Sequence, residues 1–144
     1  MVSVFDVAKY ILEKQGRMST WKLQKLCYYS LAWHFTWTEH RLFTEDFQAW
    51  RNGPVCPELF AVHKGLFMID ASELPFGNSD KLDTDERESV DVVLKDYGDW
   101  SPYELRALTH HEFPWLNARG NLPDDANSEE IISLESMGNY YGSL

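Results

Sequence analysis

Apolar and polar positions alternate with a helical period over much of the chain, beginning with its first residues. The aliphatic side chains of this segment share one helical face: Val4, Ala8, Ile11 and Leu12. Ser3 precedes the stripe, with Asp6 three residues later as in a capping box, and Gly16 follows it as a helix stop. The pattern therefore predicts an amphipathic N-terminal helix, and the charged residues within it exclude a signal peptide.

The segment from about Thr20 to Thr38 is predicted to form a longer helix, with Ser19 or Thr20 as its cap. Apolar side chains surround almost its whole circumference, and helices of this kind are usually enclosed by other elements. We therefore expect it at the centre of the domain. The residues expected in its core-facing positions include Cys27, Trp33 and Trp37.

A different pattern follows this helix. Residues 43–51 alternate loosely between apolar and polar, which predicts a short extended segment, and 52–54 (Asn-Gly-Pro) reads as a turn. Pro57 is well placed as the first residue of a short helix that reaches about Gly65.

The second half of the chain continues the helical pattern. We predict a loop over 68–84, followed by a helix that Thr84 caps and Gly98 ends. The next helix has Ser101 as its cap and Pro102 as its first residue, and Glu104 completes a capping box. A last helix is predicted from Ser128 to about Tyr141. Together the elements predict a mainly α fold. It is a compact helical domain around a central buried helix, with a short extended segment near residues 43–51, and it spans residues 1–144 as a single domain.

Composition narrows the function. The formal net charge is −10 and the thirteen Lys and Arg residues form no basic run, so we expect no direct contact with nucleic acid. The acidic field would favour a basic protein partner, although acidity also serves solubility alone. No apolar run approaches the roughly 20 residues that cross a bilayer, so no membrane association is expected. Cys27 and Cys56 lack a Cys-x-x-Cys spacing, which indicates reduced thiols in a cytoplasmic protein without a metal or other cofactor.

The stretch LTHHEFPW, residues 108–115, offers the most suggestive chemistry. His111-Glu112 begins a His-Glu-x-x-His zinc motif, but Trp115 stands where the second histidine should be. Neighbouring helical residues point about 100° apart, so His110 and His111 are poorly placed to share one ion. The pattern favours a helix end, where an imidazole lies near unpaired carbonyls.

Two other groups of residues are candidate sites. Cys56 could be a nucleophile near a helix N-terminus, but a buried apolar role is favoured for it. Trp50-Arg51 and Trp115 with Arg119 join the residue types that dominate protein interfaces, at positions that flank turns. For each of these residues a structural role is the alternative, and Arg119 could pair with Glu112 or Glu104.

Several separate stretches resemble one known family, in the same order along the chain. They are VAKYILEK, MSTWKLQKLCYYSLAWH, FQAWRNGPVCPELF and YGDWSPYELRALTHHEFPW followed by Ala118-Arg119. They resemble the Panacea domain of SocA-like antitoxins, which also occurs in phage-associated proteins of the GepA type. The resemblance extends from about Phe5 to Tyr141.

The resemblance implies a mainly helical, non-enzymatic antitoxin of a toxin–antitoxin system that neutralises its cognate toxin by direct binding. It implies no catalytic residue, and it identifies neither the toxin nor the oligomeric state. We predict that the partner-binding residues include Trp50, Arg51, His110, Trp115 and Arg119. Two alternatives remain: a phage or prophage accessory protein that binds a host factor, and a hydrolase that uses Cys56 or the pair His110/His111.

Overall fold

The chain is mainly helical, as its pattern predicts. Residues 2–144, which the computed structural model describes, form seven α-helices, two single-turn 3₁₀ helices and two small antiparallel sheets. The helices are α1 (Val4–Gln15), α2 (Thr20–Thr38), α3 (Pro57–His63), α4 (Thr84–Tyr97), α5 (Pro102–Thr109), α6 (Phe113–Arg119) and α7 (Leu134–Tyr141), with η1 (Ala71–Glu73) and η2 (Ser79–Lys81) as 3₁₀ turns. The strands are β1 (Met18–Ser19), β2 (Gln48–Trp50), β3 (Gly53–Val55) and β4 (Met68–Ile69).

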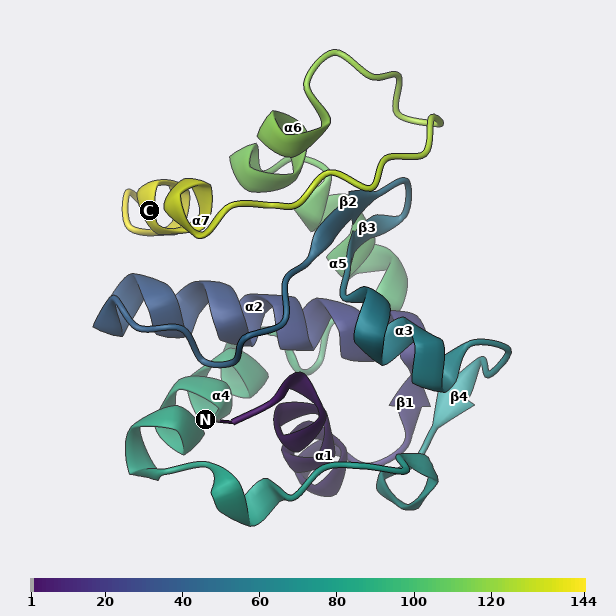
Figure 1. Cartoon of the computed structure of the whole chain (residues 1–144), viewed down its shortest axis with the longest axis vertical. Coiled ribbons are helices and arrows are strands. Elements are labelled where there is room, and N and C mark those ends of the chain that lie inside the picture. The colour runs from purple at the N-terminus through teal and green to yellow at the C-terminus, as the bar shows by residue number, and fades with distance from the viewer. Residues whose placement is uncertain (1) are drawn as a thin grey trace.

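Helix α2 runs through the middle of the molecule (Figure 1). Helices α1 and α4 lie on one side of it, α7 lies on the other, and α5, β1 and β3 also contact it. Ser19 caps the helix by accepting a hydrogen bond from the backbone N–H of Lys22. Because neighbours surround α2, burial extends around its circumference, and the prediction of an enclosed central helix is confirmed.

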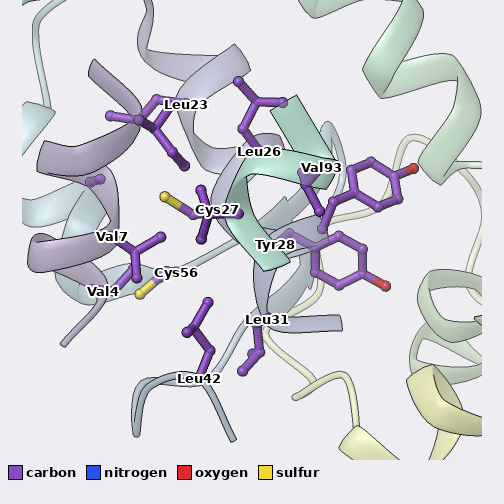
Figure 2. Close-up of a cluster of buried hydrophobic side chains, with 14 of the residues drawn as sticks. Val4, Val7, Leu23, Leu26, Cys27, Tyr28, Leu31, Leu42, Cys56 and Val93 are labelled. Carbon is purple, nitrogen blue, oxygen red and sulfur yellow. The ribbon is translucent and has the colours of Figure 1, made fainter. Parts of the chain in front are cut away.

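The core is one contiguous cluster of apolar side chains around α2. Figure 2 shows Leu23, Leu26 and Leu31 of α2 meeting side chains from α1 and α4, with Cys27 and Cys56 among them. Each fully buried aliphatic side chain contributes roughly 1.5–3 kcal/mol to folding, so this enclosure supplies much of the driving force.

Strands β2 and β3 form a short hairpin in which Trp50 faces Gly53. The connection 51–52 is short, and Gly53 has a φ of 113°, which favours glycine. Residues 130–132 run beside β2, since Ala49 donates to the carbonyl of Glu130 and Ile132 donates to that of Phe47. The extended segment predicted near residues 43–51 is thus confirmed for Gln48–Trp50.

A buried glutamine ties α2 to the end of this hairpin. The Gln24 side-chain oxygen accepts the backbone N–H of Cys56 at 2.8 Å, and its Nε2 donates to the Cys56 carbonyl at 3.2 Å. The same Nε2 lies 3.0 Å from Nε2 of His63, which therefore accepts. One side chain thereby pairs both backbone groups at the junction of β3 and α3.

Local signals placed several helix ends correctly. The capping boxes at Ser3 and Ser101 are present, and Pro57 is the first residue of α3. Two caps were predicted wrongly. Asp83, rather than Thr84, caps α4, and Ser133, rather than Ser128, caps α7. Each error arises because more than one Asp, Ser or Thr residue near the helix start offers an equally good cap locally.

Three further expectations need correction. Trp37 is not core: it is 47% exposed and its ring lies against Trp33. The segment 68–84 is not only loop, because Met68–Ile69 pairs with β1 and two 3₁₀ turns follow. Helix α6 was not among the predicted elements, because a proline disfavours helix at the residue before it and Pro114 follows Phe113. Proline is tolerated in a first helical turn, however, and α6 begins with Phe113 and Pro114.

We predict that Gln24→Leu lowers the free energy of unfolding by about 2 kcal/mol, because it leaves the buried backbone N–H of Cys56 without a partner and removes the donor to Nε2 of the buried His63. Urea unfolding followed by circular dichroism measures this loss. Gln15→Leu, at an exposed position at the end of α1, is the matched control and should change stability by less than about 0.5 kcal/mol. Equal stability of the two variants would contradict the role of Gln24 as a clamp, that is, as the side chain that joins α2 to the backbone of Cys56.

Candidate partner-binding surface

The residues predicted to contact a partner lie around one structural unit, the β2–β3 hairpin. Trp115 and Arg119 of α6 reach its backbone from within: Trp115 Nε1 donates to the carbonyl of Trp50 at 2.9 Å, and Arg119 Nη1 donates to that of Ala49 at 2.9 Å. The two side chains are only 1% and 4% exposed. They hold Trp50 and Arg51 in place, whereas Arg51 itself is exposed.

Arg119 does not pair with Glu112 or Glu104, as one alternative expected. Its guanidinium donates to three backbone carbonyls, those of Ala49, Pro123 and Ala126, and so joins β2 to the loop after α6. It also lies 4.6 Å from the Trp115 ring, and the His110 ring stacks on Trp115 at 4.1 Å. The guanidinium of Arg119 thus packs against the face of the Trp115 ring, where a cation is favoured, while its N–H groups bind the carbonyls.

Glu112 also has a structural position. It is the N-cap residue of α6, and its Oε1 accepts the hydroxyls of Tyr29 at 2.7 Å and Tyr141 at 2.8 Å. Burial raises the pKa of its carboxyl above the ordinary value, while these two hydrogen bonds act in the opposite direction. Glu112 therefore links α2, α6 and α7, and its position is explained without metal chemistry.

The outer side of the hairpin is aromatic and hollowed. The Trp50 and Phe60 rings meet edge to face at 5.0 Å, and Trp21 lies 6.4 Å from Phe60. With Arg51 and Asn52 they line a hollow of about 400 Å³. The residues of this face project from α2, β2 and α3, elements that the core and the Gln24 clamp hold together.

A second hollow of about 220 Å³ adjoins the first and shares Trp21 and Asn52 with it. Its further lining residues are Lys25, Pro102, Tyr103 and Arg106. Tyr103 is 78% exposed, and Arg106 Nε donates to Asn52 Oδ1 at 3.3 Å. We call the two hollows together the aromatic–arginine surface; its members are Trp21, Lys25, Trp50, Arg51, Asn52, Phe60, Tyr103 and Arg106. Within the described part of the chain, no acidic side chain lines either hollow.

Lys25 is the unusual member of this surface. It is 1% exposed, its Nζ lies 5.2 Å from the Trp21 ring centre, and it lacks a hydrogen-bond partner among residues 2–144. Burial and, to a smaller extent, the nearby charge of Arg106 together lower the pKa of its amino group to about 7. Near neutral pH the amine is therefore only partly protonated.

His110 and His111 have different surroundings. The buried Nε2 of His110 has no partner within the described chain, and burial together with Arg106 and Lys25 lowers its pKa to about 4. The His111 Nδ1 lies 2.9 Å from the Ala107 carbonyl, to which it donates. The prediction of an imidazole at the helix end is thus confirmed for His111, whereas His110 lies in the packing around Trp115.

The groups suggested for hydrolytic or metal chemistry are not arranged for it. Cys56 is buried, its thiol lies 3.6 Å from Glu58 Oε1, and burial raises the pKa of the thiol to about 12. A thiol with this pKa stays protonated near neutral pH and is a poor nucleophile. In the region that the structure describes, no three His, Cys, Asp or Glu side chains are grouped so that they could hold a metal ion.

Another hollow, of about 440 Å³, lies at the C-terminal end of α2, beside α4. Trp37 and Val92 line it together with Asp85 and Glu88, so it combines apolar and acidic groups. This hollow also contains an exposed aromatic side chain, Trp37, but its lining has none of the cationic side chains found on the aromatic–arginine surface.

Sequence reasoning missed Trp21, Lys25 and Arg106 as surface residues. Lys25 belongs to an apolar helix and Arg106 to a short helix, and neither stands beside a turn. The available signal was a lysine on a helix predicted to be enclosed on all sides, since buried lysines are rare unless they are paired.

We predict that Lys25→Met is more stable than the parent protein at pH 6 and that its advantage shrinks as the pH rises. The Lys25 pKa of about 7 lies below the ordinary 10.5, so between these values the unfolded chain binds more protons and the parent gains stability with pH. The difference in free energy of unfolding should narrow by about 2 kcal/mol between pH 7 and pH 9. Urea unfolding at both pH values measures it. Arg106, His63 and His110 stay in both proteins, so a pH-independent difference would contradict the burial of the amine.

None of the helices within residues 2–144 has the length and apolar character needed to cross a membrane.

Comparison of the sequence with known protein families identifies the family of this chain. The model of the family described as "Antitoxin SocA-like, Panacea domain" matches residues 23–116, which include α2, the β2–β3 hairpin and α5. Neither the curated proteins nor the solved structures that were compared with the chain contain a match. Because the matched region covers well over half of the sequence, the chain belongs to the family of SocA-like antitoxins with a Panacea domain.

Proposed function

We propose that this chain is a non-enzymatic antitoxin that neutralises a cognate toxin by direct binding through the aromatic–arginine surface. The family supports a protein partner in general. The observation that carries the proposal is the position of Trp21, Trp50 and Phe60 around adjoining hollows, with Arg51 and Arg106 beside them. Tryptophan, tyrosine and arginine at the centre of a hollowed patch are the residues that contribute most binding energy in protein interfaces.

We propose different roles for the five residues first predicted. Arg51 and Trp50 are proposed to contact the toxin. Trp115 and Arg119 are buried, and we propose that they act indirectly by fixing the hairpin backbone. His110 stacks on Trp115 and supports the same arrangement.

The net charge of −10 supports a basic toxin, because a long-range acidic field speeds the approach of a basic protein. Contact then occurs at a surface whose own charged side chains are cationic. The one contiguous core of the described residues supports treatment of residues 1–144 as a single binding domain. Blockade of the toxin would be steric, which needs no reacting group on this chain.

We expect Arg51→Glu to weaken toxin binding at least tenfold, which corresponds to about 1.4 kcal/mol, and to abolish rescue of growth. The partner to test is the product of the neighbouring gene, co-expressed with this chain in a growth assay and co-purified with it. Arg51 is exposed, so the melting temperature should stay within about 2 °C of the parent.

Glu88→Lys is the matched control, because it reverses an exposed charge at the other hollow, beside Trp37. It should leave rescue intact. Loss of rescue with Glu88→Lys and full rescue with Arg51→Glu would move the interface to α4 and contradict the proposal. If the neighbouring product is harmless and the chain instead captures a host protein, the accessory-protein alternative is correct.

A further inference from the structure

The second hollow contains a cation that the fold leaves unpaired. Two other polar side chains of α2 that point toward neighbouring segments have partners: Lys22 donates to the Gly98 carbonyl at 2.6 Å, and Gln24 pairs with Cys56. Lys25 lies next to Gln24, is equally buried, and has none within residues 2–144. An unpaired buried amine costs free energy, so its presence at a hollow needs a reason beyond packing.

The surroundings of Lys25 hold it in place. A Cβ atom at Gly53 would lie 2.6 Å from Lys25 Cε and 3.2 Å from its Nζ, so the hairpin backbone packs directly on the lysine. The Trp21 ring covers it from α2 at 5.2 Å. The Oγ1 of Thr109 also lies near this point, 3.1 Å from the same Cβ position. It donates its hydrogen bond to the Arg106 carbonyl and is no partner for Lys25. The lysine is thus confined between β3, Trp21 and α5 at the wall of the hollow.

A second cation lines the same hollow. The Nε of Arg106 donates a hydrogen bond to Asn52. The terminal amino groups of Arg106 have no hydrogen-bond partner within the described residues. The two cations have no acidic neighbour in the lining, although the chain has an excess of ten acidic charges. The local charge is therefore opposite to the charge of the whole protein, and it complements a single anion.

We propose that the hollow between Trp21 and Arg106 binds a carboxylate, and that the carboxylate is supplied by the toxin as an acidic side chain or C-terminus. The second part rests on the proposed function. A volume of about 220 Å³ is below the roughly 300–1,000 Å³ of small-molecule sites and suits one inserted side chain. The net charge of −10 disfavours polyanions such as nucleic acid, whereas a lone carboxylate on a basic protein meets no such repulsion.

The pairing would be strong because it occurs on an apolar wall. Trp21 and Pro102 supply apolar lining beside the two cations, and a charge-assisted hydrogen bond next to apolar groups is stronger than one in open solvent. The carboxylate would also raise the Lys25 pKa from about 7 toward its ordinary value, so that toxin binding takes up protons near neutral pH. The groups that face Lys25 from other elements, Arg106, His110 and His63, do not supply this counter-charge.

The test uses the whole chain without toxin, labelled with ¹³C at lysine Cε, and sodium acetate as probe at constant ionic strength. We expect the Lys25 resonance, identified by its loss in Lys25→Met, to shift saturably with a Kd on the order of 10 mM. Its pKa should rise by about one unit or more at saturation. Arg106→Gln should weaken binding about tenfold, and Lys95→Met, at an exposed position of α4, should not change it.

A Lys25 resonance that acetate leaves unmoved, or moves no more than Lys95, would overturn the proposal, as would tighter binding of inorganic phosphate than of acetate. In the presence of the toxin, Arg106→Gln should weaken binding about tenfold, and an unchanged affinity would overturn the assignment of the carboxylate to the toxin. Because the acetate titration needs no toxin, its failure leaves the antitoxin proposal standing. Failure of the toxin assay with Arg51→Glu likewise leaves the acetate result standing.

Discussion

The enclosure of α2 is the constraint on which the rest of the structure depends. A helix buried on every side obliges each of its polar groups to find a partner from another element. Gln24 satisfies this requirement by pairing both backbone groups of Cys56, and it thereby fixes where β3 ends and α3 begins. Lys25, one residue later, does not satisfy it within the described chain. The adjoining outer surface is built from the elements that these two residues contact.

The same surface depends on a second buried unit, formed by His110, Trp115 and Arg119. The side chains of His110 and Arg119 lie against the Trp115 ring, and Trp115 and Arg119 donate to the carbonyls of Trp50 and Ala49. A hairpin this short has little stability of its own. Its position therefore depends on α6 as well as on the contact of α2 with β3, so the buried side chains of Trp115 and Arg119 determine where the exposed face of the hairpin lies. The buried amine of Lys25 lacks a partner within residues 2–144, which costs stability, so under the proposed carboxylate binding this position is one where stability and binding compete.

Family membership and geometry answer different questions about this chain. The matched region, residues 23–116, identifies an antitoxin family but names no contact residue. The geometry places three cationic side chains and four aromatic rings around adjoining hollows, and it places the thiol of Cys56 where burial keeps it protonated. Together they favour recognition by an outer surface over chemistry at a reactive centre.

Local chemistry in the sequence determined the helices with clear periodicity and caps, from Ser3 at α1 to the box at Ser101, and the enclosure of α2. It also selected Trp50, Arg51, His110, Trp115 and Arg119 as related residues. It could not tell which of them are exposed, because residue type at a turn does not report burial. Only the tertiary structure decided that Trp115 and Arg119 lie inside, that Trp37 lies outside, and that Lys25 and Arg106 share a hollow. The burial of Trp115 and Arg119, for example, depends on contacts with segments 65 and 70 residues away, and no local pattern encodes such contacts.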